Sequence, residues 1–136
     1  MKITISDQDE GADSRRISEA LKNDVEAEFG AADRRPLLIT AQTSNGLAGG
    51  LKGFSHWRWL YISQLWVDSA SRGSGLGAQL LEACVQEARA RGCAGVYVDT
   101  FSPRAKAFYE KNGFGEFGEL AGMPVGHARY FLSRKV

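Results

Sequence analysis

The segment from Leu65 to Gly77, LWVDSASRGSGLG, has the residue types of an anion-binding turn. An apolar run leads into a polar loop dense in glycine, and the apolar spacing of a helix follows. Glycine lets such a loop bend and allows its backbone to approach a ligand. The first turn of a helix has N–H groups without intrahelical partners, and its dipole attracts negative charge. The segment therefore predicts a site for a phosphate-bearing ligand.

Two glycine fingerprints fit this segment. Gly73, Gly75 and Ala78 match the dinucleotide pattern G-x-G-x-x-[GA]. Arg72, Gly75 and Gly77 match [RQ]-x-x-G-x-[GA], which resembles the pyrophosphate-arm signature of the GNAT acyltransferase superfamily. A dinucleotide-binding unit starts near its own first strand and needs two halves, whereas this loop lies in the middle of a chain of 136 residues. The dinucleotide interpretation is therefore disfavoured.

A second segment strengthens the resemblance. Residues 99–114, DTFSPRAKAFYEKNGF, are similar to the superfamily's motif N-x-x-A-x-x-[LF]-Y-x-x-x-G-F. Its residues also have a local logic, because Ser102 is a good N-cap and Pro103 is tolerated at the first helical position. Gly113 is typical of a left-handed helix stop. The resemblance covers roughly residues 59–118.

The resemblance implies acetyl-CoA as the co-substrate. In similar proteins the strand before the loop splays from its neighbour, and its exposed edge hydrogen-bonds the pantetheine arm. Here that edge would be Leu65, Trp66 and Val67, with one N–H as the oxyanion donor. The implied pyrophosphate-binding residues are Arg72, Gly73, Ser74, Gly75, Leu76, Gly77 and Ala78. Ser102 takes the place of the superfamily's usual Asn, and it either contacts the arm or serves only as the N-cap.

Tyr109 matches the superfamily's general acid, which protonates the departing sulfur, although a buried aromatic residue would also fit its position. The general base is less well defined. Some relatives have a Glu where this chain has Tyr97, and Asp99 lies two residues on, on the same strand face. Asp99 is either that base, acting directly or through a water, or a structural brace for the turn that follows. His56 and His127 are the other candidates, and His127 is the better placed of the two.

The remaining notable side chains have simpler interpretations. Trp57, Trp59 and Trp66 are expected to pack in the core or at its rim, although Trp57 or Trp59 could flank a cationic acceptor. Cys84 and Cys93 have no metal-ligand spacing, and Cys84 falls on the inner side of a helix. No metal site is predicted.

The elements that must position these residues follow an α/β order. Strands are expected at 2–6, 36–42, 47–55, 59–67, 94–99, 114–120 and 129–132, and helices at 14–29, 76–92 and 103–112. Asn45-Gly46 is a strong hairpin signal. The resemblance implies a mixed, mostly antiparallel sheet of about seven strands with splayed central strands and flanking helices. The superfamily often has two helices between its first two strands, whereas this chain has room for one long helix or for a helix and a short turn.

Composition indicates one domain over residues 1–136. A formal net charge of +1 gives no reason to expect nucleic acid or an anionic membrane as a partner. No apolar run has the length of a membrane span, and residues 1–5 do not read as a signal peptide, so a cytoplasmic location is expected.

These observations predict an N-acetyltransferase that transfers the acetyl group of acetyl-CoA directly to a primary amine in a ternary complex. The acceptor is a small-molecule or peptide amine, and the resemblance leaves room for a homodimer. The alternative is a catalytically silent acyl-CoA-binding or sensor module, which would keep the glycine loop but need neither acid nor base. A nicotinamide-binding oxidoreductase is a third, weaker hypothesis.

Overall fold

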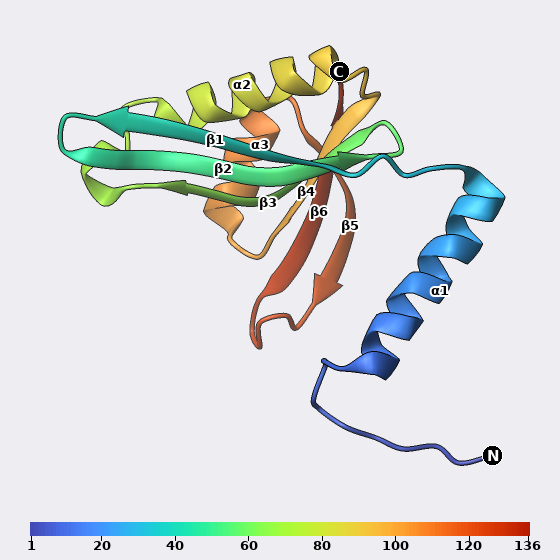
Figure 1. The fold of residues 1–136 in the computed structure, drawn as a ribbon. Coiled ribbons are helices and arrows are strands. Elements are labelled where there is room, and N and C mark those ends of the chain that lie inside the picture. The colour runs from blue at the N-terminus through green and yellow to red at the C-terminus, as the bar shows by residue number, and fades with distance from the viewer. The chain divides into compact units, whose positions relative to one another are not determined.

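The computed structural model describes residues 1–136 (Figure 1). The chain divides into two compact units, residues 1–32 and residues 33–136. The predicted site residues all lie in the second unit.

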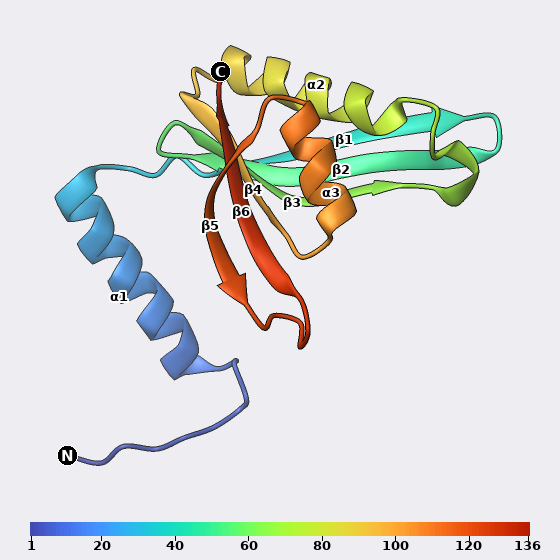
Figure 2. The same cartoon turned by 180° about the vertical axis from the view of Figure 1, so that it is seen from behind.

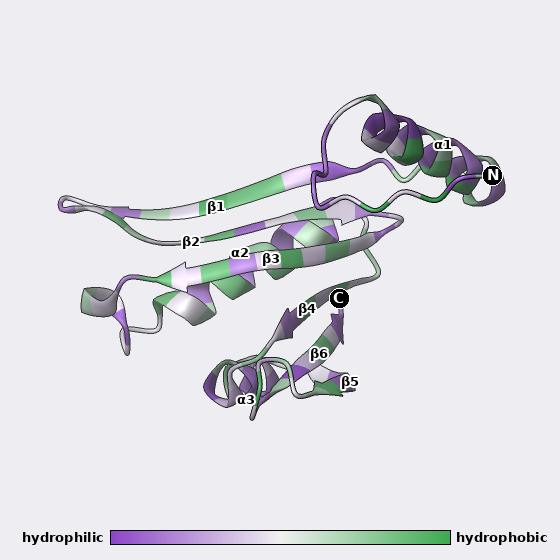
Figure 3. Cartoon of the chain, turned by 90° about the horizontal axis from the view of Figure 1, so that it is seen from below, coloured by the Kyte–Doolittle hydropathy of each residue, from purple (hydrophilic) through white to green (hydrophobic).

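The first unit contains helix α1 (Ala12–Phe29). Its apolar residues Ile17, Leu21 and Val25 recur every four positions, which is the helical period that predicted it. Hydrophilic and hydrophobic residues alternate along the helix in Figure 3. The strand predicted at residues 2–6 is wrong, because this stretch has no strand structure. A strand needs a partner for its backbone groups, and within this unit there is none.

The second unit is built on one sheet with the order β1-β2-β3-β4-β6-β5. It has six strands rather than the expected seven: β1 (Arg35–Thr43), β2 (Gly46–His56), β3 (Trp59–Val67), β4 (Gly95–Thr100), β5 (Gly115–Ala121) and β6 (Ala128–Lys135). The β3–β4 pair is parallel, and the other pairs are antiparallel. The hairpin predicted at Asn45-Gly46 is confirmed, with Ser44 and Asn45 forming the turn and Gly46 beginning β2.

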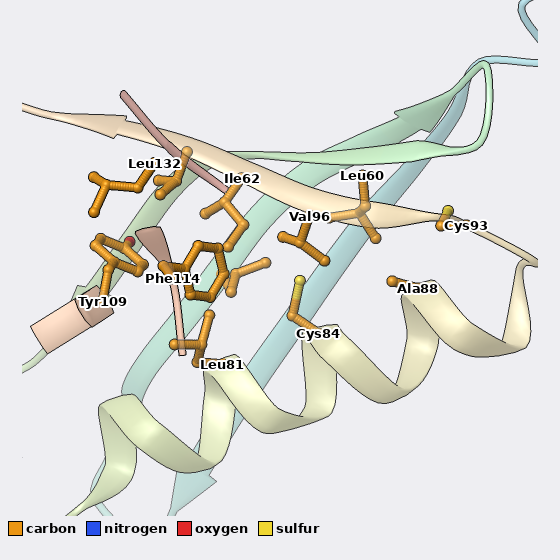
Figure 4. Packing of buried hydrophobic residues seen from close by; sticks show 12 residues of the cluster. Leu60, Ile62, Leu81, Cys84, Ala88, Cys93, Val96, Tyr109, Phe114 and Leu132 are labelled. Carbon is orange, nitrogen blue, oxygen red and sulfur yellow. The ribbon is translucent and has the colours of Figure 1, made fainter. Parts of the chain in front are cut away.

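Helices α2 (Leu76–Ala90) and α3 (Pro103–Lys111) lie on the same face of this sheet (Figure 2). A short 3-10 helix, η1 (Ser69–Ser71), precedes α2. Between this face and the two helices lies the core, which includes Leu60, Ile62 and Val96 from the sheet and Leu81 and Cys84 from α2 (Figure 4). The predicted inward orientation of Cys84 is confirmed, since this side chain is completely buried.

Alternation along the strands sends the intervening side chains to the opposite face. There Phe54, His56, Trp59, Tyr61 and Tyr97 form a chain of ring contacts with centroids 4.9 to 6.4 Å apart. We call this set the aromatic face. Both helices of residues 33–136 pack on the other side, so the aromatic face has no helix of its own unit against it.

Arg91 fixes the C-terminal end of α2 to the sheet. Its guanidinium donates to the backbone oxygens of Arg35 and Pro36 at 2.9 and 3.0 Å and to the Ser55 hydroxyl at 3.0 Å. It also pairs with Glu87 at 2.8 Å, one helical turn earlier. These contacts hold α2 across β1 and β2, which in turn fixes where its N-terminus points.

Candidate active site

The glycine loop predicted to bind phosphate is a turn that requires glycine. Gly73 and Gly75 have φ of +79° and +86°, a left-handed backbone that other residues rarely adopt. A Cβ at either position would meet no atom within 4 Å, so the backbone here borders open space. Gly75 is the N-cap of α2. The bend that the sequence predicted is therefore confirmed, and its backbone remains accessible.

The same stretch carries free hydrogen-bond donors. None of the backbone N–H groups from Gly73 to Ala78 donates to a protein acceptor. The first N–H of α2 that does so is that of Gln79, which donates to the Gly75 oxygen. Such a row of unpaired amides at a helix N-terminus suits the pyrophosphate of coenzyme A. The residues present therefore fit that group.

Arg72 and Ser74 have contacts that shape the loop itself. The Arg72 Nε donates to the Val67 backbone oxygen at 3.2 Å, and the Ser74 hydroxyl donates to the Ser71 backbone oxygen. Arg72 thereby ties the loop to the end of β3. The groups of residues 73–78 that have no protein acceptor are backbone amides, and we call this stretch the cradle.

Strand β3 leaves its parallel neighbour halfway along its length. The pairing with β4 runs from Trp59 with Gly95 to Ile62 with Val98 and then stops. At this point Ser63 forms a bulge opposite β2, because Lys52 pairs with Gln64 and Gly53 pairs with Ile62. A bulge bends its strand and increases its twist. Residues 63–67 therefore have no β4 partner, as the predicted splay requires.

Alternation decides which backbone groups this free edge offers. Asp68 N–H donates to the Ala48 oxygen on β2 at 2.8 Å. Since antiparallel partners alternate between the two edges of a strand, Trp66 also faces β2, whereas Leu65 and Val67 direct their N–H and C=O groups to the open edge. Of the three predicted residues, Leu65 thus offers both its N–H and its C=O to an extended arm, whereas Val67 offers its N–H, because its oxygen already accepts from Arg72.

Tyr109 lies on α3, beside the cradle. Its neighbour Phe108 packs over the start of α2, where a Cβ on Gly77 would lie 3.5 Å from the ring. The Tyr109 ring is buried and contacts the rings of Phe108 and Phe114, the second of which lies beside it in Figure 4. The Tyr109 hydroxyl has no hydrogen-bond partner in the protein. Since every fully buried side-chain N or O atom has such a partner, this oxygen is accessible to solvent. Burial raises the pKa of Tyr109, which keeps the hydroxyl protonated at neutral pH.

Ser102 caps α3 as its sequence context predicted. Its hydroxyl oxygen accepts a hydrogen bond from the Ala105 N–H at 3.2 Å, and Pro103 follows at the first helical position. This contact accounts for the residue type at position 102.

Asp99 is held by two partners. The Tyr61 hydroxyl donates to one carboxylate oxygen at 2.5 Å, and Arg129 on β6 donates to the other with Nε and an Nη atom. Burial and this hydrogen bond raise the pKa of Tyr61 to about 12. Asp99 therefore organises a network at the point where β3 and β4 separate, while its side chain remains largely buried.

The two histidines lie in different surroundings. His56 joins the aromatic face, and its Nε2 is 2.8 Å from the Tyr97 hydroxyl. Burial, followed by the charge of Arg34, lowers the pKa of His56. His127 is exposed in the turn between β5 and β6, where its N–H donates to the Pro124 oxygen. Trp59 and Tyr97 pack together on the aromatic face, whereas Trp57 and Trp66 are exposed.

Tyr61 and Arg129 are the site residues that sequence reasoning missed. They lie 38 and 30 positions from Asp99, and neither belongs to a local motif. Alternation along β3 could have set Tyr61 on the face opposite Leu60 and Ile62, but only the register of β3 with β4 places it near Asp99.

Comparison with known proteins defines the class. The chain matches the Acetyltransferase (GNAT) family over residues 5–114. It is 36% identical to Acetyltransferase Atu2258 of Agrobacterium fabrum over 99% of both chains. The chain therefore belongs to the GNAT acetyltransferase family.

Other relatives extend this result. Blasticidin-S acetyltransferase of Streptomyces morookaense is 37% identical and aligns over 76% of this chain and 80% of its own length. A crystal structure of an acetyltransferase from Bacillus cereus superimposes with a TM-score of 0.80 at 28% identity, covering 96% of this chain and 98% of that one. A Bacillus anthracis structure, solved with acetyl coenzyme A, shares the fold with a TM-score of 0.68 at 23% identity, over 74% and 62% of the two chains.

No helix is long and apolar enough to cross a membrane. No group of three or more His, Cys, Asp or Glu side chains is arranged to hold a metal ion.

Proposed function

We propose that the protein is an acetyl-CoA-dependent N-acetyltransferase, which transfers the acetyl group to a primary amine by direct attack in a ternary complex. The observation that carries this proposal is the continuity of two donor sets. The unpaired edge of β3 ends directly at the loop whose amides, from Gly73 to Ala78, have no protein acceptor. One extended ligand with a peptide-like arm and a pyrophosphate matches both.

When bound, acetyl-CoA supplies the thioester from which the acetyl group is transferred. The Leu65 N–H lies on the free edge and is the proposed oxyanion donor for the thioester oxygen. The amine nitrogen forms a bond to the thioester carbon, and the carbon–sulfur bond breaks. Tyr109 gives its hydroxyl proton to the departing sulfur, and what supports this role is its place on α3 beside the start of α2, with a phenol that is protonated at neutral pH.

The amine must lose a proton as it is acylated. We propose Asp99 as the acceptor of this proton, directly or through a water, since it is the carboxylate at the separation of β3 and β4. Its hydrogen bonds to Tyr61 and Arg129 support the alternative, in which Asp99 positions these two side chains and solvent takes the proton. The two roles predict different pH profiles.

A thiol-release assay tests the function. The full-length protein is incubated with acetyl-CoA and a panel of small amines and peptide amines, with blasticidin S included because a relative acetylates it. We expect release of coenzyme A that depends on the amine, with an N-acetyl product identified by mass. CoA binding without amine-dependent release would instead indicate the acyl-CoA-binding module, and absence of CoA binding would refute both.

A further inference from the structure

A hollow of about 490 Å³ lies over β1 and β2 on the same side as the aromatic face. This volume is within the range of roughly 300–1,000 Å³ that is usual for small-molecule sites. Arg34, Leu38, Lys52, Phe54 and Ser63 are among the residues that line it. Strand pairing sets Leu38 beside Lys52 on the outer side of the sheet. We call this feature the β1–β2 hollow.

The β1–β2 hollow has a positive lining without a negative one. Its two charged side chains are Arg34 and Lys52, and no Asp or Glu lines it. The ion pairs of the molecule involve neither of these cations. The guanidinium carbon of Arg34 lies 3.8 Å from the centroid of the Phe54 ring, so an aromatic contact orients this group. The edge of a guanidinium stacked in this way is free to donate two parallel hydrogen bonds to an anion.

The positive field extends to a neighbouring group. His56 is in ring contact with Phe54, and the charge of Arg34 contributes to lowering its pKa. His56 therefore adds no positive charge at neutral pH, and its imidazole is engaged by the Tyr97 hydroxyl. Arg34 and Lys52 are the cations left to attract an anionic ligand.

The hollow adjoins the proposed reaction site through Ser63. This residue lines the hollow and is also the bulge at which β3 leaves β4. Neighbouring strands are about 4.8 Å apart, so Lys52 on β2 is separated from the β3–β4 opening by roughly 7 to 10 Å. One small molecule of that length can occupy both places.

We propose that the β1–β2 hollow binds an acidic group of the acceptor, so that the substrate is an amine which also carries a carboxylate or a phosphate. This inference rests on the proposed acetyl transfer and adds the chemical class of the acceptor. Arg34 supplies a bidentate contact, and Lys52 supplies a second positive charge. The amine end then lies at the opening, where β3 and β4 separate.

Matched substrates test the proposal. Initial rates are measured with 6-aminohexanoate, 6-aminohexyl phosphate and 6-aminohexanamide. The three compounds differ at the end away from the amine, which is acidic in the first two and uncharged in the amide. We expect kcat/KM to be at least about tenfold higher for an acidic substrate than for the amide, because the free energy of one hydrogen bond to a charged group corresponds to a factor of that size. The better of the two acids identifies the group that the hollow prefers.

Variants of the lining sharpen the test. Arg34→Gln and Lys52→Gln should each remove part of this preference, lowering the ratio of acid to amide kcat/KM by about threefold where the ratio is about ten, and the double variant should bring it close to one. Lys111→Gln removes an exposed cation of α3 outside the hollow and should leave the ratio unchanged. Melting temperatures show whether each variant is folded. A ratio near one for the unmodified protein, or a ratio insensitive to both substitutions, would overturn the proposal.

A binding measurement separates this inference from the proposed function. The CoA-loaded protein is titrated with each of the three compounds, and backbone amide NMR shifts are followed at Arg34, Lys52 and Ser63. Saturable shifts with the acids but not with the amide support the hollow even where no thiol is released. Absence of such shifts for both acids overturns the hollow while leaving acetyl transfer to be judged by thiol release alone.

Discussion

The two sides of the β3–β4 opening are constructed differently. On the side of α2 and α3, which we call the donor side, the groups offered to a ligand are backbone amides of residues 73–78 and the free edge of β3. On the opposite side, the acceptor side, the groups are side chains, including Tyr61, Asp99 and Arg129. Apart from Tyr109 on α3, the donor side thus depends on the course of a single segment, and the acceptor side depends on strands brought together from distant parts of the sequence.

This difference explains how each side can vary. A backbone cradle needs glycine at two positions and a helix start, and it binds the same ligand whatever most side chains are. A side-chain network changes its specificity with each substitution. We therefore expect substitutions on the donor side to affect CoA and the chemical step, and substitutions on the acceptor side to affect the choice and protonation of the amine.

The largest effect is expected at Tyr109. Tyr109→Phe removes one hydroxyl from a ring that stays packed between Phe108 and Phe114. We expect kcat to fall by on the order of 10²–10⁴, with little change in acetyl-CoA affinity, because a general acid is lost. Steady-state kinetics measure this change, and Tyr130→Phe on β6 provides the matched deletion. An unaltered kcat would mean that the thiolate leaves unassisted or that product release limits turnover.

The cradle is expected to show the next largest effect. Gly75→Asp places a negative charge beside the amides, and we expect CoA affinity to fall by about 10² to 10³-fold through like-charge repulsion. Gly75→Asn has nearly the same shape, and both residues tolerate the left-handed backbone seen there. Calorimetry on the two folded variants isolates the charge. Equal affinities for the two variants would show that the pyrophosphate lies elsewhere.

Asp99→Asn probes the boundary between the two sides. If Asp99 takes the proton of the amine, kcat/KM should drop by on the order of 10²-fold at neutral pH and recover partly at higher pH, where more free amine is neutral. Arg129→Met removes the partner but keeps the carboxylate. The pH–rate profiles of these variants decide the role. Superimposable profiles for Asp99→Asn and the unmodified protein would assign Asp99 a structural role and leave His127 or solvent as the base.

The smallest effect concerns stability on the acceptor side. The pKa of His56 is lowered in the folded protein, so the unfolded chain binds its proton more readily. The contribution of His56 to folding is therefore complete above about pH 6.5, the pKa of an unperturbed histidine, and is lost as the pH falls further. His56→Gln should have a urea midpoint less dependent on pH between pH 7.5 and 5.5. His127→Gln, at an exposed histidine, should behave like the unmodified protein.

Sequence reasoning was most successful where structure is local. The bend of the glycine loop and the left-handed stop at Gly113 were both predicted, and Gly73, Gly75 and Gly113 all have the positive φ that glycine favours. The N-cap at Ser102 could be predicted because the capping contact reaches only three residues along the chain. The prediction of a strand at residues 2–6 was wrong because alternation over so short a stretch gives no information about a partner strand.

The acceptor side was less predictable for a physical reason. Asp99 and Tyr61 meet only because β3 and β4 are parallel neighbours, and Arg129 joins them through the pairing of β4 with β6. No spacing within a single segment encodes such meetings. Arg34 and Lys52 were not singled out either, because their proximity depends on the register of β1 with β2.

The parallel pairing at the centre of the sheet also has a consequence for folding. Strands β1, β2 and β3 are joined by two-residue turns, whereas Trp59 pairs with Gly95, 36 positions later. Closing the longer loop costs more entropy, so we expect the three-stranded meander to form ahead of the β3–β4 contact. Kinetic φ-values should therefore be higher for Leu51→Ala on β2 than for Val98→Ala on β4, and the reverse order would contradict this sequence of events. The opening between β3 and β4 is then among the last parts of the molecule to be assembled.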